Sequence, residues 1–204
     1  VGTTKVYGDY SEIVSAWPKP AAPVPSAVSA GYNSVKISWP AVGGASGYEI
    51  RDNAEHKIGE ATNSATPSYT VSGLTAGEEY SYKVVAYKTQ GESRLYGDYS
   101  VVVNATPVPS APAGVTAVSA SYNSININWG TVEGAEGYAL LRSTSPSGSY
   151  ERIYSDTSTS YTDNNLITGT TYYYKVFAYI NGIPEIKGDE CTAVSVKPIP
   201  AAPV

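Results

Sequence analysis

An internal repeat limits what this chain can fold into more than any other feature. The segment AVSAGYNSVKISWPAVGGASGY, which begins at Ala27, returns as AVSASYNSININWGTVEGAEGY from Ala117, at an offset of 90. Similarly, LTAGEEYSYKVVAY from Leu74 returns as LITGTTYYYKVFAY from Leu166. A repeat of this length in 204 residues predicts two copies of one domain-sized unit.

Clusters of proline mark the borders of these units. Ten of the 14 prolines lie in three clusters, where they stiffen the backbone and remove hydrogen-bond donors. We therefore expect one domain over residues 21–107 and a second over residues 108–198. Residues 1–20 are then the final strand and linker of a preceding repeat, and residues 199–204 begin the next linker.

Apolar residues alternate within each repeat, which is the period of a half-buried strand. Val35, Ile37 and Trp39 point one way, and the matching residues of the second repeat keep the same alternation. The pattern predicts an all-β protein with seven short antiparallel strands per repeat, packed as two sheets. The expected core includes four matched pairs of residues: Trp39 and Trp129, Tyr48 and Tyr138, Leu74 and Leu166, and Tyr80 and Tyr172.

These residues resemble a tandem of fibronectin type III domains of a bacterial surface or secreted multidomain protein. The resemblance rests on the paired tryptophans, on the Gly-Tyr pairs ending at Tyr48 and Tyr138, and on the Leu, Gly and Tyr spacing that ends at Tyr80 and Tyr172. It implies an immunoglobulin-like sandwich for each repeat. It also implies a tyrosine corner, in which the phenol bonds to nearby backbone. The implied setting is extracellular.

Charge and rare residues exclude several functions. A net charge of −5 without a Lys/Arg cluster excludes nucleic acid as a partner. One His and one Cys leave no internal disulfide and no His/Cys metal cage, and we expect no metal and no cofactor. No run of 18 apolar residues is present, so we expect no membrane insertion.

The sequence gives no support to catalysis. His56 lies in a polar stretch that the second repeat lacks, and no nucleophile motif accompanies it. Lys187-Gly188-Asp189 resembles an integrin-binding tripeptide, but Tyr96-Gly97-Asp98 stands at the matching place, so Gly-Asp is interpreted as a constant of a turn. Cys191 aligns with Ser100 and is expected to be a small strand residue. We expect no catalytic residue and no enzyme.

One face of the second repeat is a candidate interaction surface. By alternation, Tyr173, Phe177 and Tyr179 face outward, joined by Leu141 from the neighbouring strand. An exposed patch of this kind binds a protein or provides a platform for a sugar ring. The alternative is that a loop or a neighbouring domain packs over it.

The first functional hypothesis is a non-catalytic spacer that displays or links other domains of a secreted or wall-attached bacterial protein. Its partners are then the neighbouring domains of the same polypeptide. The alternative is an adhesin or carbohydrate-binding module, with a protein or glycan ligand on the outward aromatic face. A third hypothesis is a strand-exchanging assembly subunit, in which Tyr10 to Ala16 pair with another molecule, or are held on their own first domain by Trp17.

Overall fold

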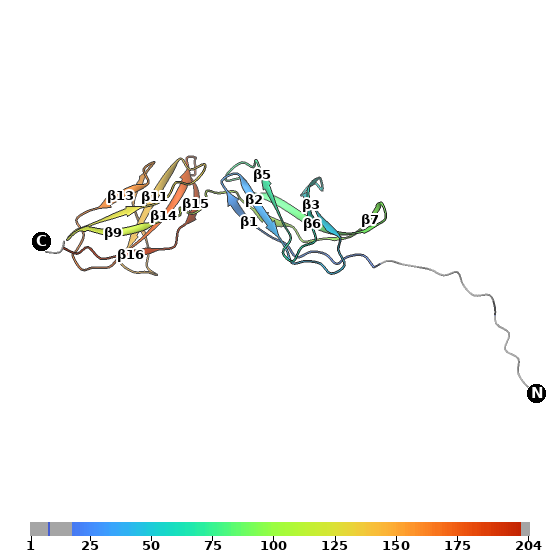
Figure 1. The fold of residues 1–204 in the computed structure, drawn as a ribbon. Coiled ribbons are helices and arrows are strands. Elements are labelled where there is room, and N and C mark those ends of the chain that lie inside the picture. The colour runs from blue at the N-terminus through green and yellow to red at the C-terminus, as the bar shows by residue number, and fades with distance from the viewer. Residues whose placement is uncertain (1–7, 9–17, 201–204) are drawn as a thin grey trace, which may run out of the picture.

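The computed structural model describes residue 8 and residues 18–200, and within these every regular element is a strand. The strands form two sandwiches, which follow one another along the chain and lie end to end (Figure 1). Residues 26–105 make sandwich one and residues 116–196 make sandwich two. The predicted all-β class and the tandem of immunoglobulin-like sandwiches are confirmed.

Sandwich one consists of a three-stranded sheet and a five-stranded sheet. The smaller sheet has the order β1-β2-β5, and the larger has the order β4-β3-β6-β7, with β8 also paired to β6. All of these pairings are antiparallel. The strands are β1 (Ser26–Gly31), β2 (Ser34–Ser38), β3 (Gly47–Asp52), β4 (Lys57–Thr62), β5 (Ser68–Ser72), β6 (Tyr80–Gln90), β7 (Ser93–Tyr99) and β8 (Val103–Ala105).

Sandwich two repeats this topology strand for strand. Its sheets have the orders β13-β10-β9 and β12-β11-β14-β15, with β16 paired to β14. The strands are β9 (Thr116–Ser121), β10 (Ser124–Asn128), β11 (Gly137–Ser143), β12 (Glu151–Asp156), β13 (Ser160–Asp163), β14 (Tyr172–Ile180), β15 (Ile186–Glu190) and β16 (Val194–Val196).

The seventh strand expected for each repeat is broken in two. In sandwich one the break lies at Ser100, whose hydroxyl accepts a hydrogen bond from the Val84 backbone N–H (2.9 Å) in place of a ladder carbonyl. In sandwich two the buried Cys191 has this role, and its Sγ lies 3.2 Å from the Val176 backbone N–H. Cys191 is therefore held inside the sheet as a backbone partner, which accounts for its match with serine.

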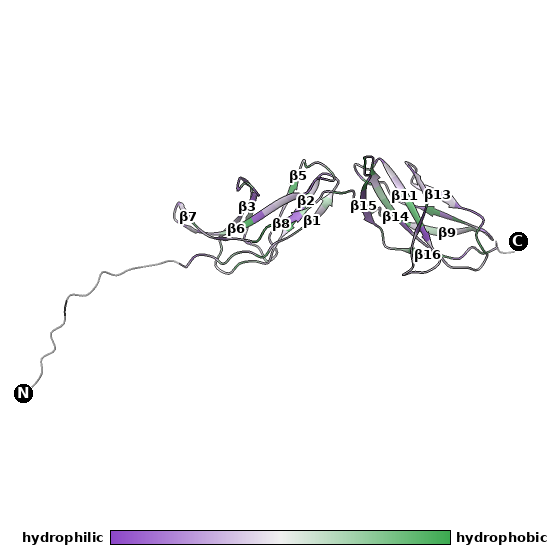
Figure 2. Ribbon diagram, turned by 180° about the vertical axis from the view of Figure 1, so that it is seen from behind, coloured by the Kyte–Doolittle hydropathy of each residue, from purple (hydrophilic) through white to green (hydrophobic). Residues whose placement is uncertain are grey.

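The core of each sandwich lies between its two sheets. Strand residues of inward parity form it, and Figure 2 shows hydrophobic and hydrophilic residues along the strands by colour. Trp39 and Trp129 lie deep in these cores, and each packs against a tyrosine, Tyr48 or Tyr138, at ring-centroid distances of 5.3 Å and 6.0 Å. Leu166 and Tyr172 are also buried, whereas Leu74 and Tyr80 are partly buried and pack against the core of sandwich one.

Both tyrosine corners are present. The Thr75 backbone N–H donates to the Tyr80 hydroxyl oxygen (3.0 Å), and the Ile167 N–H donates to the Tyr172 hydroxyl oxygen (3.0 Å). The turns that precede these tyrosines contain Gly77 and Gly169 at φ near +80° (80° and 79°), a conformation that favours glycine. The matched Leu-x-x-Gly spacing therefore has a conformational reason.

Candidate functional site

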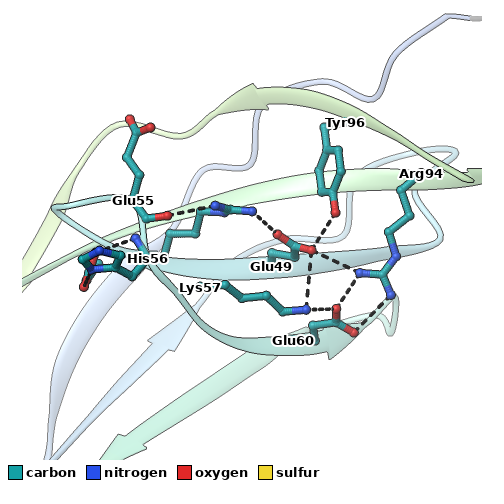
Figure 3. Close-up of polar contacts among 9 residues, drawn as sticks. Glu49, Glu55, His56, Lys57, Glu60, Arg94 and Tyr96 are labelled. Carbon is teal, nitrogen blue, oxygen red and sulfur yellow. Dashed lines mark hydrogen bonds and ion pairs between the residues drawn. The ribbon is translucent and has the colours of Figure 1, made fainter.

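A charged cluster on the outer face of sandwich one is the most elaborate polar arrangement among the described residues. It is centred on Glu49 of β3, whose side chain points away from the core and is nevertheless only 3% exposed. We call this set the Glu49 cluster; Figure 3 shows it, and its members are Glu49, Arg51, Lys57, Glu60, Arg94 and Tyr96.

Four side chains meet the Glu49 carboxylate. Arg51 Nη2 lies 2.6 Å from Oε2, and Arg94 Nη1 lies 3.1 Å from Oε1. Tyr96 donates its hydroxyl hydrogen to Oε1 (2.7 Å), and Lys57 Nζ is 3.6 Å from the same atom. Both oxygens of this buried carboxylate therefore face a donor or a cation, as burial of a charge requires.

Glu60 of the edge strand β4 completes the cluster. Its carboxylate binds both Lys57 and Arg94, so Arg94 joins the edge strand β4 to β7 across the outer face of the sheet. The Arg94 guanidinium also lies over the Tyr87 ring, 4.1 Å from its centroid. The cluster covers this face, and its charges satisfy one another rather than pointing at an open site.

These contacts change the pKa values of both carboxyls. Burial by itself raises the pKa of Glu49, but the hydrogen bonds from Tyr96 and Arg51 outweigh it, so its pKa is lowered from 4.5. Hydrogen bonds from Arg94 and Lys57 lower the pKa of Glu60 from 4.5 to about 2. Both groups are charged carboxylates at neutral pH, so neither carboxyl carries a proton that acid catalysis could use.

The lowered pKa values predict a loss of stability in acid. Because the folded-state pKa of Glu60 lies below its unfolded value, its contribution is complete above about pH 5 and is lost as the pH falls through the folded-state pKa. We expect the free energy of unfolding of sandwich one to fall between about pH 5 and pH 2, and Glu60→Gln to weaken this pH dependence. Urea unfolding at several pH values measures it. Glu92→Gln, in the exposed turn after β6, is the charge-matched control, and an identical effect of both variants would contradict the assignment.

The predicted interaction surface of sandwich two is covered, and the expectation that it is exposed is wrong. Phe177 and Tyr179 are 4% and 9% exposed, Leu141 is also buried, and Tyr173 is partly buried. Strand parity placed these residues correctly on the side away from the core. Leu141, Phe177 and Tyr179 form, with Ala139, a second and smaller hydrophobic cluster on the outer face of the large sheet, against which Tyr150 packs.

Charged side chains from neighbouring strands provide the cover. Arg152 of β12 lies over the rings of both Phe177 and Tyr179, at 5.5 Å and 5.2 Å from their centroids, and is paired with Glu185 at 3.1 Å. Lys187 lies over the Phe177 ring at 4.6 Å. The arrangement parallels the Glu49 cluster, since an ion pair again runs across the outer face, and the rings of Phe177 and Tyr179 lie beneath it.

A buried ionic group in sandwich two was not anticipated from the sequence. Asp163 of β13 is buried and accepts hydrogen bonds from Tyr174 (2.8 Å) and from Arg142 (3.1 and 3.2 Å). Burial and the bond to Asp163 raise the pKa of Tyr174 well above its ordinary value. Asp163 and Val71 occupy equivalent positions of the repeat, since Asp163 pairs with Ile125 as Val71 pairs with Val35. A charged residue where the other repeat has an apolar one was therefore the signal in the sequence.

The remaining candidates lie apart from one another. His56 is in an exposed turn, where its Nδ1 is 3.1 Å from the Asp52 carboxylate. Gly188 and Asp189 lie inside strand β15, so the interpretation of Gly-Asp as part of a turn is wrong. Trp17 and Tyr10 to Ala16 lie outside the described residues.

Among residue 8 and residues 18–200, no group of three or more His, Cys, Asp or Glu side chains is placed to hold a metal ion. The same residues contain no helix that is long and apolar enough to cross a membrane.

Comparisons with known proteins agree with this geometry. The family model of the fibronectin type III domain matches residues 20–103. Exoglucanase B of Cellulomonas fimi is 30% identical over 79% of this chain and 16% of its own length. A Kelch domain-containing protein of Saccharolobus solfataricus is 31% identical over 91% of this chain and 25% of its own length. The chain thus spans a quarter or less of these two relatives.

Among solved structures, a two-domain fibronectin type III segment of chicken tenascin covers 88% of this chain and 99% of its own, at 16% identity and a TM-score of 0.44. The fold defines the class: an all-β protein of immunoglobulin-like sandwiches in tandem. Within that class, residues 20–103 form a fibronectin type III domain, and sandwich two repeats its topology.

Proposed function

We propose that this chain is a non-catalytic spacer within a larger extracellular protein, secreted or wall-attached in a bacterium, where its two sandwiches hold other domains at a set separation and orientation. A spacer needs a joint that resists bending, so the linker between the sandwiches is the part that carries the proposal. The proposed function requires no catalytic residue, no metal and no cofactor.

The supporting observation is that the linker is hydrogen-bonded to both sandwiches. On the side of sandwich one, the Gly77 N–H donates to the Pro107 carbonyl (3.0 Å), and Val108 exchanges two hydrogen bonds with the Ser29 hydroxyl (3.0 and 3.1 Å). On the side of sandwich two, the Asp189 N–H donates to the Pro109 carbonyl (3.0 Å). Adjacent linker residues are therefore bonded to different sandwiches, and the prolines further restrict the backbone.

The comparisons support the same role. An exoglucanase contains a similar region that amounts to a small part of its length, as expected for a module that accompanies other domains. The adhesin or carbohydrate-binding alternative depended on an open aromatic face, and Arg152 and Lys187 cover that face. We therefore do not propose it.

Gly188 offers a direct test, because the linker backbone packs against it. A Cβ atom at this position would lie 2.4 Å from the Pro109 carbonyl oxygen and 2.7 Å from that of Ala178, both backbone atoms. Gly188→Ala should therefore displace the linker and loosen the joint. Gly97→Ala is the matched control, since its Cβ would meet Pro20, which precedes sandwich one and is not in the joint.

Spin labels at Val28 and Val118 report the joint. Both side chains are exposed on the first strand of their sandwiches, and Cys191→Ser removes the native thiol and installs the residue found at Ser100. Pulsed electron paramagnetic resonance should give one narrow distance distribution for the chain and for Gly97→Ala, and a broad one for Gly188→Ala. A broad distribution in the chain without either glycine substitution would overturn the spacer function.

A further inference from the structure

The joint between the sandwiches has a reciprocal contact in which each side offers one glycine and one large side chain. Tyr32 of sandwich one lies against Gly134, where a Cβ atom would be 2.3 Å from the tyrosine Cγ. In return, Ile186 of sandwich two lies against Gly77, where a Cβ would be 3.0 Å from its Cδ1. Both glycines have positive φ (74° and 80°), so two constraints favour glycine there.

The far end of sandwich two has the same residues that sandwich one contributes to this joint. No described part of the chain packs over them. Tyr122 stands at the position of Tyr32 and is 59% exposed, and Gly169 stands at the position of Gly77 with nothing within 4 Å of an added Cβ. Ile167 and Ile199 beside them are exposed as well. This end therefore presents apolar side chains of the kind that are packed at the joint.

The linker that leaves sandwich two is already held as the internal linker is. The Gly169 N–H donates to the Pro198 carbonyl (3.0 Å), as Gly77 does to Pro107. Ile199 exchanges two hydrogen bonds with the Ser119 hydroxyl (2.9 and 3.2 Å), as Val108 does with Ser29. The chain therefore leaves sandwich two in the same direction, relative to that sandwich, in which the internal linker leaves sandwich one. A following sandwich would then sit against sandwich two as sandwich two sits against sandwich one.

The leading end of sandwich one, where the chain enters it, carries the complementary half. Gly44 stands at the position of Gly134, with a φ of 76° and nothing within 4 Å of an added Cβ, and Leu95 stands at the position of Ile186. A hollow opens beside Gly44. Six of its lining residues match those that the linker and sandwich two contribute to the crevice around Tyr32. Ala21, Ala22, Val24, Ala41, Val42 and Gly43 correspond to Ser110, Ala111, Ala113, Thr131, Val132 and Glu133.

We propose that the end of sandwich two around Tyr122 is a docking surface for the leading end of a further sandwich of this repeat. Tyr122 would lie against the glycine that corresponds to Gly134, and Gly169 would receive the side chain that corresponds to Ile186. The inference deepens the proposed spacer function and rests on it. The sequence Pro-Ala-Ala-Pro-Val, at 200–204 and again at 20–24, supports this occupant, since the linker leaving sandwich two matches the linker leading into sandwich one.

The test joins two copies of the chain at this shared linker. Residues 1–204 are followed directly by residues 25–204 of a second copy, with Cys191→Ser in both, so that the junction keeps the natural linker sequence. One spin label is placed at Val118 of the first copy and one at Val28 of the second. This pair repeats, across the new joint, the label pair that reports the internal joint.

We expect the new joint to give a single narrow distance distribution, as the internal joint does. Tyr122→Ser in the first copy should broaden it without unfolding sandwich two, because the side chain is exposed there in the single chain. Tyr122→Phe keeps the ring and should keep the distribution narrow. Tyr32→Ser is the matched variant for the internal joint and should broaden that distribution in the same way.

Each other outcome has a defined meaning. A broad new joint beside a narrow internal joint would overturn this inference and leave the spacer function standing. Broad distributions at both joints would overturn both. A narrow new joint that Tyr122→Ser does not change would overturn the contact assigned to Tyr122.

Discussion

Replacing Trp39 by alanine is expected to lower the free energy of unfolding of sandwich one by about 3–5 kcal/mol and to leave sandwich two folded. Trp39 is 3% exposed and packs edge-on against Tyr48, so its removal leaves a large cavity between the sheets. Urea unfolding followed by circular dichroism measures the loss, and the fluorescence of Trp129 reports sandwich two separately. Trp129→Ala should produce the same loss in sandwich two.

Trp39→Phe is the matched control for this prediction. Within the described part of the chain, the Nε1 atoms of Trp39 and Trp129 are buried and find no hydrogen-bond acceptor. Phenylalanine therefore removes no hydrogen bond, and its cost is that of a smaller cavity, which should be well below the cost of alanine. If phenylalanine and alanine proved equally costly, packing could not be the source of the stability that Trp39 provides.

The core of each sandwich could be predicted from the sequence because it depends on a local rule. Successive strand residues alternate between faces, so the parity of Ile37 and Trp39 is readable without knowing which strands are neighbours. The repeat then gave the same parity for Ile127 and Trp129, and all four residues are buried.

What covers the outward faces could not be read in this way. Arg152 and Glu185 reach Phe177 and Tyr179 from other strands and turns, and their approach depends on sheet order and register. The repeat could not predict this cover either, because the two sandwiches place their ion pairs differently. On sandwich one the edge strand β4 carries the acid, Glu60, whereas on sandwich two the edge strand β12 carries the base, Arg152. Strand alternation predicts the face of the sheet on which a side chain lies, but it does not predict how exposed that side chain is.

The Gly-Asp pairs show the same limit. Gly97 and Gly188 were expected in turns, as glycine next to aspartate often is. Instead each lies within a strand, where the backbone of a linker distant in sequence packs against it. A close approach of this kind leaves no local signature, although its recurrence in the repeat was visible.

Glu49→Ala is expected to destabilise sandwich one by about 2–3 kcal/mol, through the loss of charged hydrogen bonds and the exposure of the remaining cations to one another. The change leaves Arg51, Lys57 and Arg94 with Glu60 as their remaining carboxylate in the cluster. The size of the loss is below that for a fully buried pair because these cations are partly exposed and water can solvate them. Chemical denaturation of the variant and the parent measures the difference.

Sandwich two supplies the control for Glu49, since Ala139 and Leu141 stand at the positions of Glu49 and Arg51. Glu49→Ala combined with Arg51→Leu should therefore recover part of the lost stability, because it removes an unpaired cation and adds apolar surface on the same face. If Glu49→Ala alone cost less than about 0.5 kcal/mol, the cluster would behave as ordinary surface ion pairs. Recovery in the double variant, by contrast, would show that an ionic cover and an apolar cover are alternative ways of closing the outer face of the same sheet.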